Sequence, residues 1–179
     1  GIVAILSQLI EKIVGLVINF LLQMFPGNND TDRIFIFDMM GGAVVKMLTD
    51  FLDILSRVPL EEAQSSLTAM MDSAAVDSAM YAHFMKLSGK YLYEPNSPFR
   101  NEEYYIPVLH HVIASSRLGE PDKARAKFRL DMALKNRPGD VAADFAYTLA
   151  DGTSGSLRQI KSSYTLLFFN SPDCEECRR

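Results

Sequence analysis

The chain ends in the sequence NSPDCEECRR, and its only two cysteines, Cys174 and Cys177, lie there at C-x-x-C spacing. Thiols this close can form a redox dithiol, supply half of a zinc site, or have no role. A zinc site needs further ligands, and the remaining candidates are the three histidines, His83, His110 and His111. Two of these are adjacent, and adjacent side chains on a helix point about 100° apart, so they cannot readily chelate one ion together. The spacing favours a redox dithiol and leaves the other two interpretations open.

Length and composition exclude several classes of protein. With 179 residues, of which 48% are hydrophobic and 22% charged, the chain can bury one sizeable core, or a core plus a small appendage. The net charge of −4 comes from acidic and basic residues without a long run of either sign, so no surface for nucleic acid is predicted. Cysteines this close cannot tie distant parts of a fold together, which excludes a disulfide framework.

The first 25 residues form a long apolar segment, GIVAILSQLIEKIVGLVINFLLQMF. As a helix rising about 1.5 Å per residue, it would be long enough to cross a bilayer. However, Glu11 and Lys12 lie near its centre, where a charged side chain costs roughly 2.5 to 3.5 kcal/mol on insertion scales. We therefore predict a buried or amphipathic helix and no transmembrane span. Because the segment lacks an initiator Met and a small-residue cleavage site, we expect the chain to begin after a removed signal or tag.

Apolar residues then recur at helical spacing as far as residue 136. The pattern predicts helices at residues 43–59, 60–74, 77–93, 102–116 and 122–136. Asn101 is a suitable N-cap for the fourth of these, Pro107 should bend it, and Pro121 suits the first turn of the fifth. With the N-terminal segment, the fold class is mainly α, with about six helices over residues 1–140. This part shows no constellation of nucleophile, base and orienting group, and we interpret its methionines as core filler.

Beyond residue 140 the apolar pattern becomes alternating. Phe145, Tyr147 and Leu149 alternate with small residues and precede an Asp151–Gly152 turn, which predicts a β-hairpin followed by a short helical turn. The sequence YTLLFF at 164–169 is apolar on both faces, as expected of a strand inside a sheet. A helix opening directly after this strand would stabilise a thiolate in the C-x-x-C. Left unpaired, the strand predicts self-association of the chain through strand exchange.

The segment from Ala142 to Arg179 resembles the opening of a thioredoxin-like domain of the peroxiredoxin and thiol-disulfide oxidoreductase type. In that family, a PDF-x-L-x-x-x-x-G-x-x-x-x-L hairpin leads to a V-x-L-x-F-W-A-x-W-C-x-x-C strand and active site. The order and spacing of the corresponding residues fit this pattern, namely Asp144, Phe145, Leu149, Gly152, Leu157, the strand and the cysteine pair. Residues 48 to 140, most clearly 77–109, resemble the uncharacterised helical domain that precedes thioredoxin-like domains in envelope proteins of anaerobic Gram-negative gut bacteria.

This resemblance implies that Cys174 is the attacking thiol and Cys177 the resolving one. Asp173 stands where the family usually has an aromatic residue, and Glu175 and Glu176 lie between the cysteines. Because carboxylates oppose ionisation of a neighbouring thiol, we expect a reducing couple, nearer about −270 than about −120 mV. The two arginines that end the chain offset part of this effect.

A complete thioredoxin-like domain needs further strands, a helix after the C-x-x-C and a cis-proline loop, together roughly 80 to 100 more residues. We therefore interpret the chain as a helical domain at 1–140 joined to an incomplete thioredoxin-like domain at 141–179. The resemblance implies the N-terminal part of a thiol-disulfide oxidoreductase of the periplasm or cell envelope, with a lipid anchor as an option for the full-length protein. Its partners would be protein thiols or disulfides, its helical domain would bind a partner or orient the redox domain, and this chain alone should be inactive. No cofactor or metal is expected.

A second hypothesis makes the helical part a non-catalytic interaction module of tetratricopeptide-like helix pairs. Residues 118–140 resemble the second helix of such a repeat, with Ala124, Phe128 and Ala133 directed inward and Pro138 closing it. A second copy at a period of about 34 residues is not evident, whereas a stable solenoid usually needs about three repeats.

Overall fold

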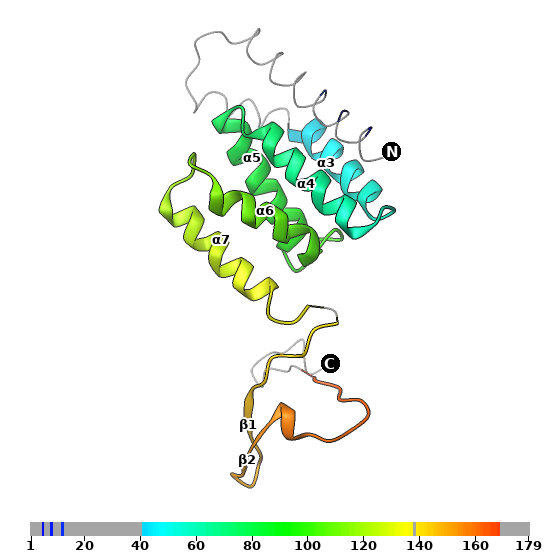
Figure 1. The fold of residues 1–179 in the computed structure, drawn as a ribbon, viewed down its shortest axis with the longest axis vertical. Coiled ribbons are helices and arrows are strands. Elements are labelled where there is room, and N and C mark those ends of the chain that lie inside the picture. Colours follow the sequence, from blue (N-terminus) through cyan, green and yellow to red (C-terminus); the bar gives the residue numbers. More distant parts are fainter. Residues whose placement is uncertain (1–4, 6–7, 9–11, 13–40, 138, 169–179) are drawn as a thin grey trace. The chain divides into compact units, whose positions relative to one another are not determined.

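The computed structural model describes residues 5, 8, 12, 41–137 and 139–168, and these form helices and one small sheet (Figure 1). The helices are α3 (Gly41–Leu55), α4 (Leu60–Ala74), α5 (Ser78–Ser88), α6 (Glu102–Ala114) and α7 (Glu120–Ala133). A π-helix (Gly89–Tyr93) follows α5, and an antiparallel pair of strands, β1 (Ala146–Thr148) and β2 (Ser154–Ser156), precedes a 3₁₀-helix (Leu157–Gln159). The predicted class, mainly α with a hairpin, is confirmed. The N-terminal helix predicted over residues 1–25 lies almost wholly outside the described residues.

The chain divides into two compact units, Gly1–Leu134 and Lys135–Arg179. The assignment of 141–179 to an incomplete thioredoxin-like domain stays a prediction. Within the described part of the chain, none of the helices has the length and apolar character needed to cross a membrane.

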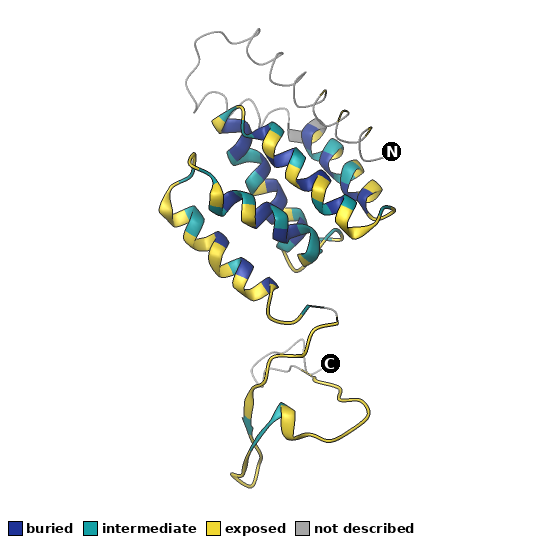
Figure 2. Ribbon diagram, viewed as in Figure 1, coloured by how far each residue is buried: buried dark blue, intermediate teal, exposed yellow. Residues whose placement is uncertain are grey.

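The core of the helical unit comes from apolar residues spaced three and four apart. On α3 these are Val44, Leu48, Leu52 and Leu55, all of them buried. Figure 2 shows the buried residues on the sides of the helices that face one another. α6 is the central helix, because it packs against α4, α5 and α7. The methionines at 70, 71 and 80 are almost completely buried, which agrees with their interpretation as core filler.

The proline inside α6 is accommodated by a side chain from another helix. Pro107 has no N–H, so the carbonyl group of Glu103, four residues earlier, loses its helical hydrogen bond. Gln64 on α4 supplies the missing donor, since its Nε2 donates to this carbonyl oxygen at 2.9 Å. The helix therefore continues to Ala114. At its start, the predicted N-cap is confirmed, because the Asn101 side chain accepts from the backbone N–H of Tyr104 at 3.3 Å.

The helix predicted over 77–93 changes geometry at its end. The α-helical part stops at Ser88, and Gly89–Tyr93 form a π-helix in which the N–H of Glu94 donates to the carbonyl of Gly89 at 3.3 Å. The wider turn rotates the side chains that follow, relative to a continued α-helix. Tyr93 thereby faces α7, where its ring lies beside Arg129.

The predicted inward face of α7 is wrong. Ala124 and Phe128 are exposed, Phe128 to 61%, whereas Ala126, Leu130 and Ala133 are buried. The buried residues are spaced four and three residues apart, and they form the apolar face of α7 that packs against α6. Only Ala133 was assigned to the correct side, so the tetratricopeptide-like register does not hold.

The second unit contains the predicted hairpin and helical turn. Tyr147 on β1 pairs with Gly155 on β2, and Gly152 takes a φ of +85° in the connecting turn, a conformation that favours glycine. The Asp144 carboxylate accepts from the backbone N–H of Arg158 at 3.0 Å and so links the segment before β1 to the 3₁₀-helix.

The strand predicted at 164–169 is not formed in the five of its residues that the structure describes. Tyr164, Leu166 and Phe168 are exposed to 95%, 93% and 81%. A strand that is apolar on both faces needs a neighbouring strand and a covering layer. β1 and β2 pair with each other, and the described residues contain no further strand for this segment to join.

Candidate functional site

The predicted dithiol lies outside the described residues. The roles of Cys174 as attacking thiol and Cys177 as resolving thiol therefore stay predictions. The histidines considered as zinc ligands lie on α5 and α6, and in the described ranges no three His, Cys, Asp or Glu side chains gather where they could hold a metal. His110 is exposed, while its neighbour His111 bonds to residues of two other helices, so these adjacent residues do have different surroundings.

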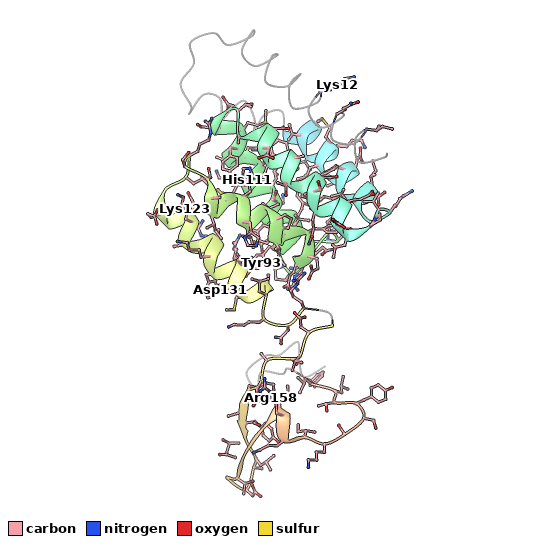
Figure 3. The ribbon with its side chains drawn as sticks, in the orientation of Figure 1. Lys12, Tyr93, His111, Lys123, Asp131 and Arg158 are labelled. Atoms are coloured by element: carbon pink, nitrogen blue, oxygen red, sulfur yellow. The ribbon has the colours of Figure 1, made fainter. Side chains whose placement is uncertain are left out.

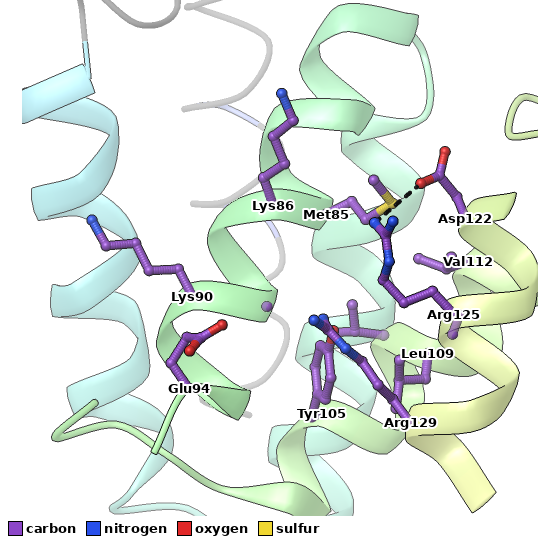
Figure 4. Close-up of a pocket in the computed structure, with 13 residues that line it drawn as sticks. Met85, Lys86, Lys90, Glu94, Tyr105, Leu109, Val112, Asp122, Arg125 and Arg129 are labelled. Carbon is purple, nitrogen blue, oxygen red and sulfur yellow. Dashed lines mark hydrogen bonds and ion pairs between the residues drawn. The ribbon is translucent and has the colours of Figure 1, made fainter. Parts of the chain in front are cut away.

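A cavity of about 350 Å³ lies among the described helices (Figure 4). It is lined by α5, the π-helix, α6 and α7. Its apolar wall comes from Met85, Val108, Leu109, Val112 and Ala126. Its polar wall comes from Lys86, Lys90, Glu94, Tyr105, Asp122, Arg125 and Arg129.

Arg129 is the best-fixed charged group in this cavity. Its Nη1 donates to the Tyr105 hydroxyl at 2.9 Å, and its guanidinium carbon lies 4.4 Å from the centre of the Tyr93 ring. The centres of the Tyr93 and Tyr105 rings lie 5.6 Å apart, so the guanidinium contacts a pair of neighbouring aromatic residues. Figure 3 labels Tyr93 beside α7. The position of its guanidinium carbon over the Tyr93 ring and the hydrogen bond to Tyr105 together orient the planar fork.

Glycine at position 89 permits this close approach. A Cβ placed there would lie 3.2 Å from Nη1 of Arg129 and 3.4 Å from the Tyr105 hydroxyl oxygen. The first distance is shorter than ordinary van der Waals contact, so a larger residue would displace the guanidinium. The start of the π-helix thus positions the arginine as well as Tyr93.

The charges that line the cavity sum to +2, from four basic and two acidic side chains, although the whole chain carries −4. Asp122 lies 3.7 Å from Arg125 and offsets part of its charge. Lys86 and Lys90 extend away from both arginines (Figure 4). Arg129 is therefore the cation that defines the electrostatic character of the interior.

A second polar cluster links Asp72, His111 and Tyr81 across α4, α6 and α5. Asp72 Oδ1 lies 3.0 Å from His111 Nε2, and His111 Nδ1 lies 2.8 Å from the Tyr81 hydroxyl. Burial raises the pKa of Tyr81; a hydrogen bond with Ser115 lowers it, and the charge of Asp72 raises it further. The order of groups is that of a catalytic relay, but Tyr81 is completely buried and no substrate can reach its oxygen. We therefore assign this cluster to packing of the three helices.

Comparison with known proteins places the helical unit in a family. Residues 38–136 match the family described as "Domain of unknown function (DUF5106)". The chain belongs to this family. The matched range covers α3 to α7, so the cavity lies within the DUF5106 domain. The predicted resemblance of residues 48–140 to an uncharacterised helical domain agrees with this match.

A solved structure extends the comparison beyond the DUF5106 domain. The chain is similar to a thioredoxin-like protein from Bacteroides caccae ATCC 43185, with 44% identity and a TM-score of 0.75. The similarity covers 84% of this chain and 54% of that one, so the chain spans about half the length of its relative. This agrees with the predicted relationship to thioredoxin-like proteins. A search among curated proteins gave no match.

The cavity in the DUF5106 domain was not predicted from the sequence. One signal was present, since Arg125 and Arg129 are four residues apart and so share a face of α7. The positions of Gly89 and Tyr93 depend on the π-helix, and no spacing in the sequence indicated a π-helix.

Proposed function

We propose that the chain is the N-terminal part of a cell-envelope, thioredoxin-like thiol-disulfide oxidoreductase, and that its helical domain binds a partner or orients the redox domain. The observation that carries this proposal is the 44% identity to a thioredoxin-like protein over 84% of the chain. Cys174 and Cys177 stand where the resembled family has its active site. The periplasmic or envelope location, with or without a lipid anchor, belongs to the same proposal.

The proposed chemistry is a two-electron exchange between two dithiol–disulfide pairs. The Cys174 thiolate attacks one sulfur of a substrate disulfide, forms a mixed disulfide and releases the other substrate sulfur as a thiolate, which takes up a proton. The Cys177 thiolate then attacks Cys174, which releases the second substrate sulfur and closes the Cys174–Cys177 disulfide. The substrate gains two electrons and two protons, and the dithiol loses them.

The tetratricopeptide-like alternative has lost its main support, because two of the three residues expected to face inward are exposed. The cavity of about 350 Å³ among its helices supports a binding role for the helical domain. It is assigned no catalytic step.

The test compares this chain with a form extended to the length of the Bacteroides caccae protein. We would measure the alkylation rate of Cys174 against pH and the reduction of insulin disulfides, with Cys174→Ser and Cys177→Ser as controls. We expect a lowered thiol pKa and turnover in the extended form only, abolished by Cys174→Ser. An extended form that folds but shows neither property would exclude the oxidoreductase proposal.

A further inference from the structure

Arg129 is held in place without being neutralised. Its contacts are to the Tyr105 hydroxyl and the face of the Tyr93 ring, and both groups are uncharged. Among the residues that the structure describes, no carboxylate lies within ion-pairing distance of its guanidinium. Its remaining N–H groups form a rigid fork, and such a fork matches the geometry of a carboxylate in a bidentate pair.

The cavity beside this fork is partly apolar and small. Val108, Leu109 and Val112 are buried in its wall, and Met85 completes the same side. About 350 Å³ is at the lower end of the range of about 300 to 1,000 Å³ for small-molecule sites, which suits a ligand of about one or two amino-acid residues. Arg125 points into the same space from α7 but already has Asp122 as a partner. One available guanidinium beside an apolar wall selects a ligand with one negative group and an apolar body.

We infer that this cavity binds a carboxylate carried on a small apolar group, with Arg129 as the anion-binding residue. Two sources share this chemistry, namely a free acylated amino acid and the C-terminal residue of a peptide. Tyr93, Tyr105 and Gly89 are positioning residues, because they orient the guanidinium. The site does not depend on the redox chemistry proposed for the cysteines.

Glu94 allows a test in which a substitution should strengthen binding instead of weakening it. It is the acidic residue of the cavity that has no ion pair within the described part of the chain, and Figure 4 shows its carboxylate on the cavity side of Lys90. Its negative charge repels an anionic ligand. Replacing it with the neutral isostere Gln should therefore strengthen binding, whereas damage to the fold would weaken it.

The experiment is calorimetric titration of the 179-residue chain with N-acetyl-leucine, N-acetyl-leucinamide and the peptide acid N-acetyl-Ala-Ala-Leu. We expect the acid to bind at least about tenfold more tightly than the amide, because the amide has no charge for Arg129 to pair with. A tighter complex with the peptide acid than with N-acetyl-leucine identifies a chain end as the source. The reverse order identifies the free acylated amino acid.

Variants test the assignment of residues. Arg129→Gln should lower the affinity for the acid at least about tenfold and leave that for the amide unchanged. Lys127→Gln removes the same charge from an exposed position of α7 outside the cavity and should change the affinity by less than about twofold. Glu94→Gln should raise the affinity about two- to fivefold. Should Arg129→Gln fail to fold, Tyr105→Phe keeps the charge but removes its positioning hydrogen bond and should lower the affinity severalfold.

Equal affinity for acid and amide would overturn the inference, as would full binding by a folded Arg129→Gln chain. Weaker binding by Glu94→Gln would also refute it, because an anion site must gain from loss of a neighbouring negative charge. Each result is independent of thiol activity, so failure here leaves the oxidoreductase proposal untouched.

Discussion

The Tyr81 hydroxyl is buried, whereas the Asp72 carboxylate in the same hydrogen-bonded cluster is exposed. We expect the hydroxyl to contribute more than the carboxylate to the stability of the helical unit. The hydroxyl lies 2.8 Å from His111 Nδ1 and donates to the carbonyl of His111 at 3.3 Å. Tyr81→Phe keeps the ring and its packing but removes the two contacts with His111 and the hydrogen bond with Ser115. The perturbation is therefore confined to one polar atom.

The expected cost follows from how strongly each partner is shielded from water. Tyr81 is completely buried and the His111 side chain is 17% exposed, so the ring nitrogen and carbonyl that lose the hydroxyl cannot easily bond to water instead. An unsatisfied buried polar group costs about 1 to 3 kcal/mol, and we expect about 2 kcal/mol for Tyr81→Phe. Asp72 is 69% exposed, so Asp72→Asn should cost less than about 1 kcal/mol.

The assay is urea denaturation followed by far-UV circular dichroism at the helical signal, which reports on the unit that contains α3 to α7. The slope with urea should stay constant, so that a shift of the midpoint reports the free energy of unfolding. His111→Ala and the double variant with Tyr81→Phe complete a cycle, whose coupling should be about 0.5 to 3 kcal/mol. A larger loss for Asp72→Asn than for Tyr81→Phe would refute the reasoning, since it would place the main contribution at the exposed end.

Three further predictions concern the buried tyrosines, the proline in α6 and the apolar segment at 164–168. Burial raises the pKa of Tyr81 and of Tyr104 above the ordinary 10.0. The folded state therefore holds these protons more tightly than the unfolded state does. The resulting contribution to stability is complete below pH 10 and is lost as the pH rises through the folded pKa. Absorbance titration of the phenols should show it, and Tyr81→Phe should reduce the alkaline loss. Gln64→Ala should cost about 1 to 2 kcal/mol because the Glu103 carbonyl facing Pro107 loses its donor, and a melting temperature equal to that of the parent chain would contradict this. Sedimentation should show concentration-dependent self-association that a Leu166→Lys substitution reduces, and a pure monomer at every concentration would exclude pairing through residues 164–168.

Most of the helical fold follows from local patterns in the sequence. α4 was predicted with the same bounds as observed, and the N-cap at Asn101 and the Gly152 turn follow from rules that depend on a few neighbouring residues. The inward face of α7 did not follow. Its apolar residues are few and spread around the helix, so the side that packs on α6 is decided by the partner helix and not by the helix itself. The strand predicted at 164–169 is not formed in the described residues 164–168 for a related reason, because a strand exists only where another strand accepts its hydrogen bonds.

The cavity was harder to predict because the position of Tyr93 beside Arg129 depends on the change from α-helix to π-helix at Gly89. A continued α-helix through Gly89 would give the residues after it a different angular position, and Tyr93 is the residue whose ring meets Arg129. The absence of a Cβ at Gly89 then leaves room for the guanidinium. Gly89→Ala separates these two effects, because the observed φ of −58° is one that alanine adopts freely, while its Cβ would lie 3.2 Å from Nη1 of Arg129. We therefore expect this variant to keep or slightly raise the melting temperature of the helical unit while lowering the affinity for N-acetyl-leucine severalfold. A variant that melts with the parent chain and binds equally well would show that positioning of the guanidinium does not depend on the missing Cβ at Gly89.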